Sequence, residues 1–260
     1  NGILTNKFMQ ILLSPAKSLN EKFPENFLLE TTTPVFFEKT KKLANILIQK
    51  SPTDLQKLFS VSEKIADLNF GRYQNFPTEL TKKNSFPTLS CFDGAVYKPI
   101  ETENFSESEW KFSQKNLKIL SGFYGVLRPL DLLYPYRLEM GTKLENPAGK
   151  NLYEFWTNQV TNLLNQTHEP IINLASKEYF SVINEKQIAA KIFHIHFKEK
   201  KDEKLKIVAI HAKKARGALA NEIIKQKITN PELIKRIKIL GYNFVSNLSD
   251  EKNFVFVRDN

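Results

Sequence analysis

Apolar and polar positions follow two different spacings along the chain, and these predict a mixture of helices and strands. Apolar side chains recur at helical spacing from Phe36 to Ile48. Gln10–Leu13 and Ile171–Leu174 are short, largely apolar runs of strand length. Lys191–Phe197 alternates with a period of two, and Lys204–His211 follows it across a wholly charged connection, which predicts a hairpin.

Start signals place further elements between these runs. Ser51-Pro52 opens a helix that continues to Phe59, and Ser62 opens the next one. Ser106 and Glu109 form a capping-box pattern for a helix running to about Leu120. The remaining predicted elements are a strand at Thr88–Phe92, helices at Ala212–Ile228 and Pro231–Ile239, and closing strands at Phe244–Val245 and Phe254–Val257. Strands and helices interleave without a regular rhythm, which predicts an α+β fold: a single domain with a mixed β-sheet surrounded by helices.

Composition narrows the class of protein. The chain has 260 residues, of which 41% are hydrophobic and 12% aromatic, so it is long and apolar enough to fold around a core. A single cysteine, Cys91, excludes an internal disulfide framework, and its place in an apolar run predicts a buried, inert thiol. No run approaches the roughly 18 apolar residues of a membrane span, and we expect a cytoplasmic protein without a membrane partner.

The chain shows no linker that would divide it. Met9 is a second plausible start, at the beginning of the first predicted strand. We therefore expect one domain over residues 9–260, with residues 1–8 as an N-terminal extension or a cloning remnant. The formal net charge of +10 suits a polyanionic partner.

The densest candidate for chemistry is the segment from Leu117 to Lys143. A helix, a turn with two glycines over Ser121–Gly125 and a second helix are the layout of a helix-hairpin-helix DNA-binding element. The glycines are three positions apart instead of the usual two, so a glycine-capped helix followed by an ordinary connector remains an alternative.

Cations form the second signal. Arginine is scarce beside lysine, yet Arg128, Arg137 and Arg216 all lie in motif-like segments, where a planar guanidinium suits bidentate oxyanion contacts. Pairing of Arg137 with Glu139, or of Arg128 with Asp131, is an equally good explanation. Lys213, Lys214 and Arg216 open a helix, where a bound phosphate would offset their unfavourable interaction with the helix dipole.

Catalytic and metal-binding candidates are fewer. Lys17 follows the first strand, and with Asp93 and Glu139 it is the candidate for nucleophilic or acid–base chemistry. His194 and His196 share a strand face, but no third ligand is evident, so we expect neither a metal nor a cofactor.

Taken together, the segments resemble the YaaA family of bacterial peroxide-stress-resistance proteins. The resemblance rests on LLSPAK (12–17), TTPVF (32–36), FDGAVY (92–97), LSGFYGVLRPLD (120–131), PYRLEMG (135–141), GKNLYEFW (149–156), NLASKEYF (173–180) and KKARG (213–217). It implies a cytosolic protein of peroxide stress that limits free iron, with a fold of its own, a basic cleft and a helix-hairpin-helix used for DNA. It implies no reaction and no known protein partner. Carried over here, the DNA-binding residues are Lys17, Ser121, Gly122, Gly125, Arg128, Arg137, Lys143, Lys150, Lys213, Lys214 and Arg216.

Three hypotheses follow. The first is a protein that binds double-stranded or distorted DNA through backbone phosphates. The alternative is an enzyme that processes a nucleotide or damaged DNA, lyase-like or glycosylase-like, with Lys17 and carboxylates in the same cleft. The third is an iron-handling protein, for which four histidines and one cysteine are a poor ligand supply.

Overall fold

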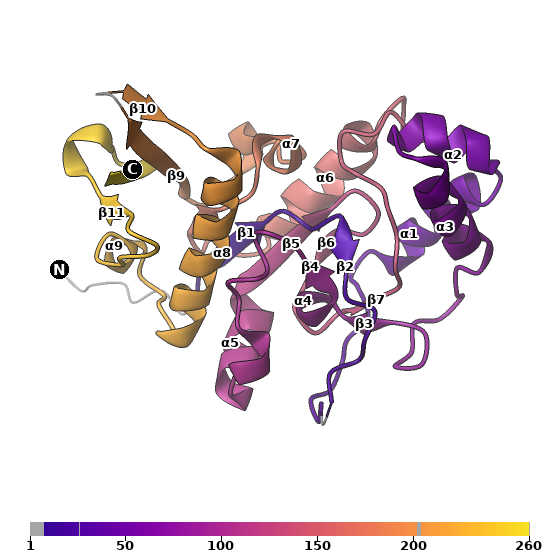
Figure 1. The fold of residues 1–260 in the computed structure, drawn as a ribbon, viewed down its shortest axis with the longest axis horizontal. Helices are drawn as coiled ribbons and strands as arrows, with labels where there is room; N and C mark the ends of the chain where they lie inside the picture. The colour runs from indigo at the N-terminus through magenta and orange to yellow at the C-terminus, as the bar shows by residue number, and fades with distance from the viewer. Residues whose placement is uncertain (1–7, 26, 202–203, 260) are drawn as a thin grey trace.

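The computed structural model describes residues 8–25, 27–201 and 204–259 (Figure 1). The strands are β1 (Gln10–Leu13), β2 (Ser18–Leu19), β3 (Phe86–Pro87), β4 (Phe92–Asp93), β5 (Leu117–Ser121), β6 (Gly125–Leu127), β7 (Leu132–Leu133), β8 (Ile171–Asn173), β9 (Ile192–Lys201), β10 (Lys204–Lys206), β11 (Asn243–Phe244) and β12 (Asn253–Asp259). The helices are α1 (Phe37–Leu47), α2 (Pro52–Phe59), α3 (Glu63–Gln74), α4 (Thr88–Cys91), α5 (Glu107–Asn116), α6 (Leu152–Leu164), α7 (Lys177–Phe180), α8 (Ala209–Lys225) and α9 (Pro231–Ile234), with 3₁₀ turns at Thr102–Asn104, Glu185–Gln187 and Ser246–Leu248.

The main sheet is mixed, as the sequence predicts. Its strand order is β11-β12-β9-β8-β1-β5-β6, and β10 pairs with β9. From β12 to β5 each neighbouring pair is parallel, whereas the outer pairs β11–β12, β9–β10 and β5–β6 are antiparallel. Helices lie around this sheet, so the α+β prediction is confirmed.

Strand β1 lies at the centre and is buried along its whole length. A strand covered on both faces needs apolar side chains at successive positions, which Ile11, Leu12 and Leu13 supply. Gln10 is the polar exception, and its side-chain amide donates to the Leu164 carbonyl at 3.0 Å. The strand order runs outward from β1 on both sides, to β5 on one side and to β8 on the other, so the sheet has a topological switch point here. Ligands of open α/β sheets bind beyond the carboxyl ends of strands at such a point.

The helices are arranged in two groups (Figure 1). Helices α1 to α3 lie together at one end of the molecule, and α2 packs directly on α3. Ser51 caps α2 and Ser106 caps α5, as the sequence predicts, and both form reciprocal capping boxes, of which only the one at Ser106 was predicted. Helix α8 packs against β9 and α5 near the centre. Among the described residues, no helix is both long enough and apolar enough to cross a bilayer.

The predicted helix-hairpin-helix is wrong. Helix α5 ends at Asn116, and the segment predicted as its last turn is strand β5, which pairs with β1. The glycine turn joins β5 to the antiparallel strand β6 and is therefore a β-hairpin. Gly125 has a φ of 71°, and a Cβ there would lie 2.8 Å from the Trp156 ring. A Cβ on Gly122 would lie 2.4 Å from the Leu138 carbonyl oxygen. These glycines permit close packing inside the protein.

Other predictions differ less. Thr88–Cys91 forms the short helix α4 instead of a strand, and the strand pairing is left to Phe92–Asp93. The first strand over Gln10–Leu13 is confirmed, and so is the pairing of β9 with β10. The second hairpin strand ends at Lys206, and His211, predicted as its last residue, belongs to α8. Helix α8 begins at Ala209, three residues before its predicted start.

Candidate functional site

A pocket of about 410 Å³ opens beyond the carboxyl ends of β1 and β8, and we call it the carboxyl-end pocket. It is lined by Ser14, Pro15, Ala16, Lys17, Ser18, Asp93, Gly94, Ala95, Val96, Glu139, Leu174, Ser176, Glu178, Tyr179, Ile210, Lys213 and Arg216. Segments from the beginning, middle and end of the chain therefore meet here. Three predicted catalytic residues (Lys17, Asp93 and Glu139) and three predicted cations (Lys17, Lys213 and Arg216) share it.

The base of the pocket joins the two central strands. Ser14 directly follows β1, and Ser176 lies three residues beyond β8. The Ser14 hydroxyl donates to the Ser176 hydroxyl at 3.2 Å and accepts from the Ser176 backbone N–H at 2.8 Å. The Tyr97 hydroxyl donates to the Ser14 carbonyl at 2.7 Å. Since these bonds link separate segments, they fix the shape of this wall.

Glu139 carries two ion pairs on one side of the pocket. Its Oε2 lies 2.8 Å from Nζ of Lys17, and its Oε1 lies 3.2 Å from the Arg137 guanidinium. The Lys17 side chain is 63% exposed, whereas those of Glu139 and Arg137 are 27% and 17% exposed. Arg137 is thus paired with Glu139 inside the protein, which agrees with the internal-pairing interpretation of the sequence. The Lys17 amine and the Glu139 carboxylate are close enough to exchange a proton.

Arg216 differs from Arg137 in that no described carboxylate lies within ion-pair distance of it. Its Nε is buried, and among residues 8–25, 27–201 and 204–259 it makes no hydrogen bond or ion pair. Burial lowers the pKa of the Arg216 guanidinium. The next residue, Gly217, lets α8 approach the 94–97 turn closely, because a Cβ there would lie 1.7 Å from the Val96 carbonyl oxygen. This close packing holds Arg216 against the pocket.

Two buried phenols lie at the pocket: Tyr179 lines it, and Tyr97 supports its base through the bond to Ser14. Burial raises the pKa of both the Tyr97 and the Tyr179 hydroxyl. Both therefore stay protonated at neutral pH and act as hydrogen-bond donors and not as bases.

The remaining predicted cations lie elsewhere. Lys143 lines a neighbouring hollow of about 560 Å³ with Lys50 and Lys57, which we call the lysine hollow. It adjoins the carboxyl-end pocket where the Gly141 N–H donates to Glu178 at 3.0 Å. In Figure 1, α7 and α2 mark this region along the upper part of the molecule.

Three other cations also lie outside the pocket. Lys214 is exposed on α8, and Lys150 is exposed just before α6. Arg128 forms an ion pair with Asp131 at 2.9 Å, at the β6 end of the sheet, which agrees with the internal-pairing interpretation.

The glycine turn over Ser121–Gly125 does not line the carboxyl-end pocket. Ser121, Gly122 and Gly125 are buried, so they offer nothing to a DNA backbone. The Ser121 hydroxyl is 2.6 Å from the Tyr136 hydroxyl, which is a core contact. These three residues therefore drop out of the proposed interface.

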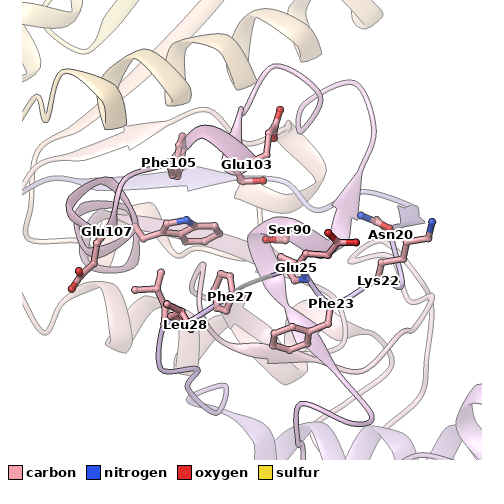
Figure 2. Close-up of a pocket in the computed structure, with 14 residues that line it drawn as sticks. Asn20, Lys22, Phe23, Glu25, Phe27, Leu28, Ser90, Glu103, Phe105 and Glu107 are labelled. Atoms are coloured by element: carbon pink, nitrogen blue, oxygen red, sulfur yellow. The ribbon is translucent and has the colours of Figure 1, made fainter.

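A larger hollow, of about 620 Å³, has the opposite character (Figure 2). The Phe27 ring packs edge-on against Phe23 and Trp110, with ring centroids 5.7 and 5.4 Å away. The carboxylates of Glu103 and Glu107 also line it. Size alone would select this hollow, but its glutamates would repel a polyanion.

The histidine pair is occupied by protein partners. The rings of His194 and His196 stack 6.5 Å apart. His194 contacts Asn173 at 3.1 Å and Glu185 at 3.2 Å, and His196 contacts Asn253 at 2.9 Å. Within the described part of the chain, no three His, Cys, Asp or Glu side chains are grouped to hold a metal ion. Cys91 is buried and unpaired, and burial raises the pKa of its thiol.

Sequence reasoning did not single out Glu178 or Ile210 as site residues, and it did not predict the contact between Ser14 and Ser176. Both serines follow apolar strands in the sequence, which is the available signal. It becomes useful only once β1 and β8 are known to be parallel neighbours.

Comparison with known proteins places the chain among relatives of the same length. A family model described as "Peroxide stress protein YaaA" matches residues 9–248. A UPF0246 protein of Acaryochloris marina is 42% identical over 254 residues, which cover 96% of this chain and 100% of the relative. A UPF0246 protein of Legionella pneumophila strain Corby is 43% identical, with 96% and 99% covered. One from Aliivibrio fischeri is 44% identical, with 96% and 98% covered.

Proposed function

This chain belongs to the family of the peroxide stress protein YaaA, and from that premise we propose that it protects DNA under peroxide stress by binding the DNA backbone. The proposed interface is the carboxyl edge of the main sheet, from α8 across the carboxyl-end pocket to the lysine hollow. We propose that this takes place in the cytoplasm and that the partner is double-stranded or distorted DNA.

One observation carries the proposal. Lys17 lies almost 200 positions before Lys213 and Arg216 in the chain, yet all three line the same pocket. The lysine hollow adds Lys50, Lys57 and Lys143 next to it, against the single carboxylate of Asp54. Phosphates attract clustered cations regardless of base sequence, and the net charge of +10 favours such an encounter.

The carboxylates of the pocket decide which cations are available. Glu139 is shared by Lys17 and Arg137, so these two cations are largely neutralised. Lys213 and Lys214 are exposed, and among the residues that the structure describes neither has an ion-pair partner. The main contacts are therefore assigned to α8 and to the lysine hollow.

Salt dependence and charge reversal test the proposal together. If about four phosphates are neutralised, log affinity for duplex DNA falls with log salt at a slope of about −3.6. The double variant Lys213→Glu/Lys214→Glu should lose about tenfold or more in affinity, similarly for all sequences, and show a shallower slope. Fluorescence anisotropy with a labelled duplex measures both quantities.

The matched control is Lys82→Glu/Lys83→Glu, an adjacent exposed pair outside both the pocket and the lysine hollow. It changes the net charge equally and should alter affinity much less. A wild-type protein that does not bind duplex DNA at low salt, or an equal loss in both double variants, contradicts the proposal.

A second function is favoured by the contact between Lys17 and Glu139. An amine with a carboxylate 2.8 Å away can pass its proton to that carboxylate and attack an aldehyde carbon, as lyases acting on abasic sites do. Attack forms the C–N bond and expels water, which leaves an imine that borohydride reduces to a stable amine. A cross-link on an abasic duplex that disappears in Lys17→Met supports this activity. No cross-link on abasic, oxidised or nicked DNA excludes it.

We propose that the protein lowers the level of free iron in the cell only indirectly, without binding iron itself. The ring nitrogens of His194 are already engaged by Asn173 and Glu185. Iron titration of the wild-type protein and of His194→Ala/His196→Ala should give no difference. Tighter iron binding by the wild-type protein would overturn the indirect interpretation.

A further inference from the structure

The guanidinium of Arg216 is the unresolved charge of the carboxyl-end pocket. Its Nε is buried without a hydrogen-bond partner in the described part of the chain, and no carboxylate lies within ion-pair distance of it there. The residue is half-buried, and only its Nε is both buried and unpartnered, so the rest of the guanidinium remains accessible to a ligand. Partial burial of a charge without a counterion is unfavourable, and a bound anion would offset that cost. The missing partner of Arg216 is therefore an anion from outside the protein.

The surroundings of Arg216 define what kind of anion fits. Helix α8 presents Ile210, Lys213 and Arg216 to the pocket at steps of three residues, which places them along one side of the helix. Lys213 and Arg216 supply two positive charges that form no ion pair with a described carboxylate, although Asp93, Glu139 and Glu178 line the same pocket. The hydroxyls of Ser14 and Ser176 line the same pocket and supply further hydrogen-bonding groups.

We propose that the carboxyl-end pocket binds a single nucleotide through its phosphate monoester, with Arg216 as the main ligand and Lys213 beside it. The proposal rests on the proposed function, because it takes the partner to be a nucleic acid or its building block. It adds that the pocket accepts a phosphate at a chain end or on a free nucleotide, whereas duplex backbone stays outside.

Charge and size favour this class of ligand. A phosphate monoester carries about −1.5 to −2 charges at pH 7 and three acceptor oxygens, which matches two cations better than a carboxylate does. The arginine fork binds such a group in bidentate fashion. The volume of about 410 Å³ lies in the range of small-ligand pockets, so a duplex cannot enter it.

Apolar lining provides for the rest of the nucleotide. Ala16, Val96 and Leu174 line the pocket beside the phenol of Tyr179. Ile210 is 50% exposed at this site, so its apolar surface is available for contact. A sugar or base lying over Ile210 would cover it.

Binding of deoxyadenosine 5′-monophosphate, measured by titration calorimetry, tests the proposal. The wild-type protein should bind this nucleotide at least about tenfold more tightly than deoxyadenosine, which lacks the phosphate. Arg216→Met should lose at least about tenfold in nucleotide affinity, and Arg216→Lys should lose less because it keeps the charge but not the fork. Arg236→Met is the matched control: it removes an exposed arginine outside the pocket and should leave affinity unchanged.

Oligonucleotides then identify the source of the phosphate. A single strand with a 5′-phosphate that binds more tightly than its 5′-hydroxyl counterpart, with the difference lost in Arg216→Met, indicates strand ends. Equal binding of both strands together with nucleotide binding indicates a free nucleotide. A wild-type protein that does not bind the nucleotide, or an Arg216→Met protein that is folded by circular dichroism and binds as the wild type does, overturns the proposal.

The outcomes separate this proposal from the proposed function. Loss of duplex binding in Lys213→Glu/Lys214→Glu concerns the outer surface, and the loss in Arg216→Met concerns the pocket. Duplex binding without nucleotide binding sinks the pocket proposal alone. Nucleotide binding that depends on Arg216, without duplex binding, sinks the proposed function alone.

Discussion

Arg258 and Arg216 differ in whether the protein supplies a carboxylate that pairs with the guanidinium. Arg258 on β12 donates to Oε1 of Glu199 at 2.8 Å, and the same oxygen accepts from His211 at 2.7 Å and Tyr242 at 2.8 Å. The Glu199 side chain is 1% exposed. Arg216, five residues beyond His211 on α8, has no such carboxylate among the described residues.

The difference separates a structural charge from a functional one. The cluster of Glu199, His211, Tyr242 and Arg258, which we call the Glu199 cluster, brings its own counterion and joins β9, β12 and the first turn of α8. It therefore fixes the end of the helix from which Arg216 extends. The Arg216 guanidinium in the carboxyl-end pocket has no ion-pair partner among the described residues, which is typical of a binding site that is completed by its ligand.

Removing the internal counterion should have the largest effect on stability. In Glu199→Ala, Arg258 loses its carboxylate and remains largely buried, so the free energy of unfolding should fall by about 3–5 kcal/mol. Urea denaturation followed by circular dichroism measures this change. Glu38→Ala, which breaks the exposed pair with Lys41, is the control and should cost less than about 1 kcal/mol. A loss in Glu199→Ala as small as that of the control would show that the cluster is not structural.

Removing the Arg216 charge should stabilise the protein, whereas removing Glu199 should destabilise it. Arg216→Met exchanges a half-buried charge, which has no ion-pair partner among the described residues, for an apolar side chain of similar length, so the free energy of unfolding should rise by about 1 kcal/mol. The same denaturation experiment in phosphate-free buffer measures it. Arg258→Met, which leaves Glu199 without its cation, should be destabilised instead. If both methionine variants are destabilised alike, Arg216 has a counterion in the native protein and the comparison fails.

Acid should weaken the Glu199 cluster in a predictable direction. Burial raises the pKa of Glu199, but the hydrogen bonds from Tyr242 and His211 and the charge of Arg258 outweigh it, and the net pKa is lowered. A carboxyl whose folded pKa lies below its unfolded value of about 4.3 stabilises the protein above that value. This contribution disappears as the pH falls through the lower folded pKa. The gap in unfolding free energy between wild type and Glu199→Gln should therefore narrow below about pH 4. A constant gap from pH 7 to pH 3 would contradict the assignment.

Local signals were enough to predict much of the fold. The strand over Gln10–Leu13 and the helix starts at Ser51 and Ser106 depend on neighbouring residues, and the structure confirms them. The end of α5 depends on distant ones. The Asn116 side chain accepts from the Met9 backbone N–H at 2.8 Å, and the next residue, Leu117, pairs with Ile11 of β1. Parallel pairing over a hundred residues leaves no local signal, so a helix was predicted where β5 lies.

In the candidate site, too, local motifs predicted part of the arrangement and distant contacts decided the rest. The sequence identified Lys17, Asp93, Glu139, Lys213 and Arg216 by their motifs, and the structure brings them to one pocket. It left open which cations are neutralised, because that depends on where Glu139 points. Glu139 pairs with Lys17 and Arg137 and not with Arg216. This pairing depends on the tertiary structure and has no signal in the sequence.

The ion pair between Lys17 and Glu139 should contribute least to stability, and this sharpens the contrast with the Glu199 cluster. The Lys17 side chain is 63% exposed, so water screens its attraction to Glu139. In Lys17→Met, Glu139 keeps Arg137 at 3.2 Å and no buried charge loses its last partner. The free energy of unfolding should therefore change by less than about 1 kcal/mol, and Tm should change little. Thermal unfolding of Lys17→Met beside Glu199→Ala measures the contrast. A loss above 2 kcal/mol in Lys17→Met would make the pair structural. A small loss leaves the amine free to move from Glu139 toward an aldehyde, which the proposed lyase activity requires.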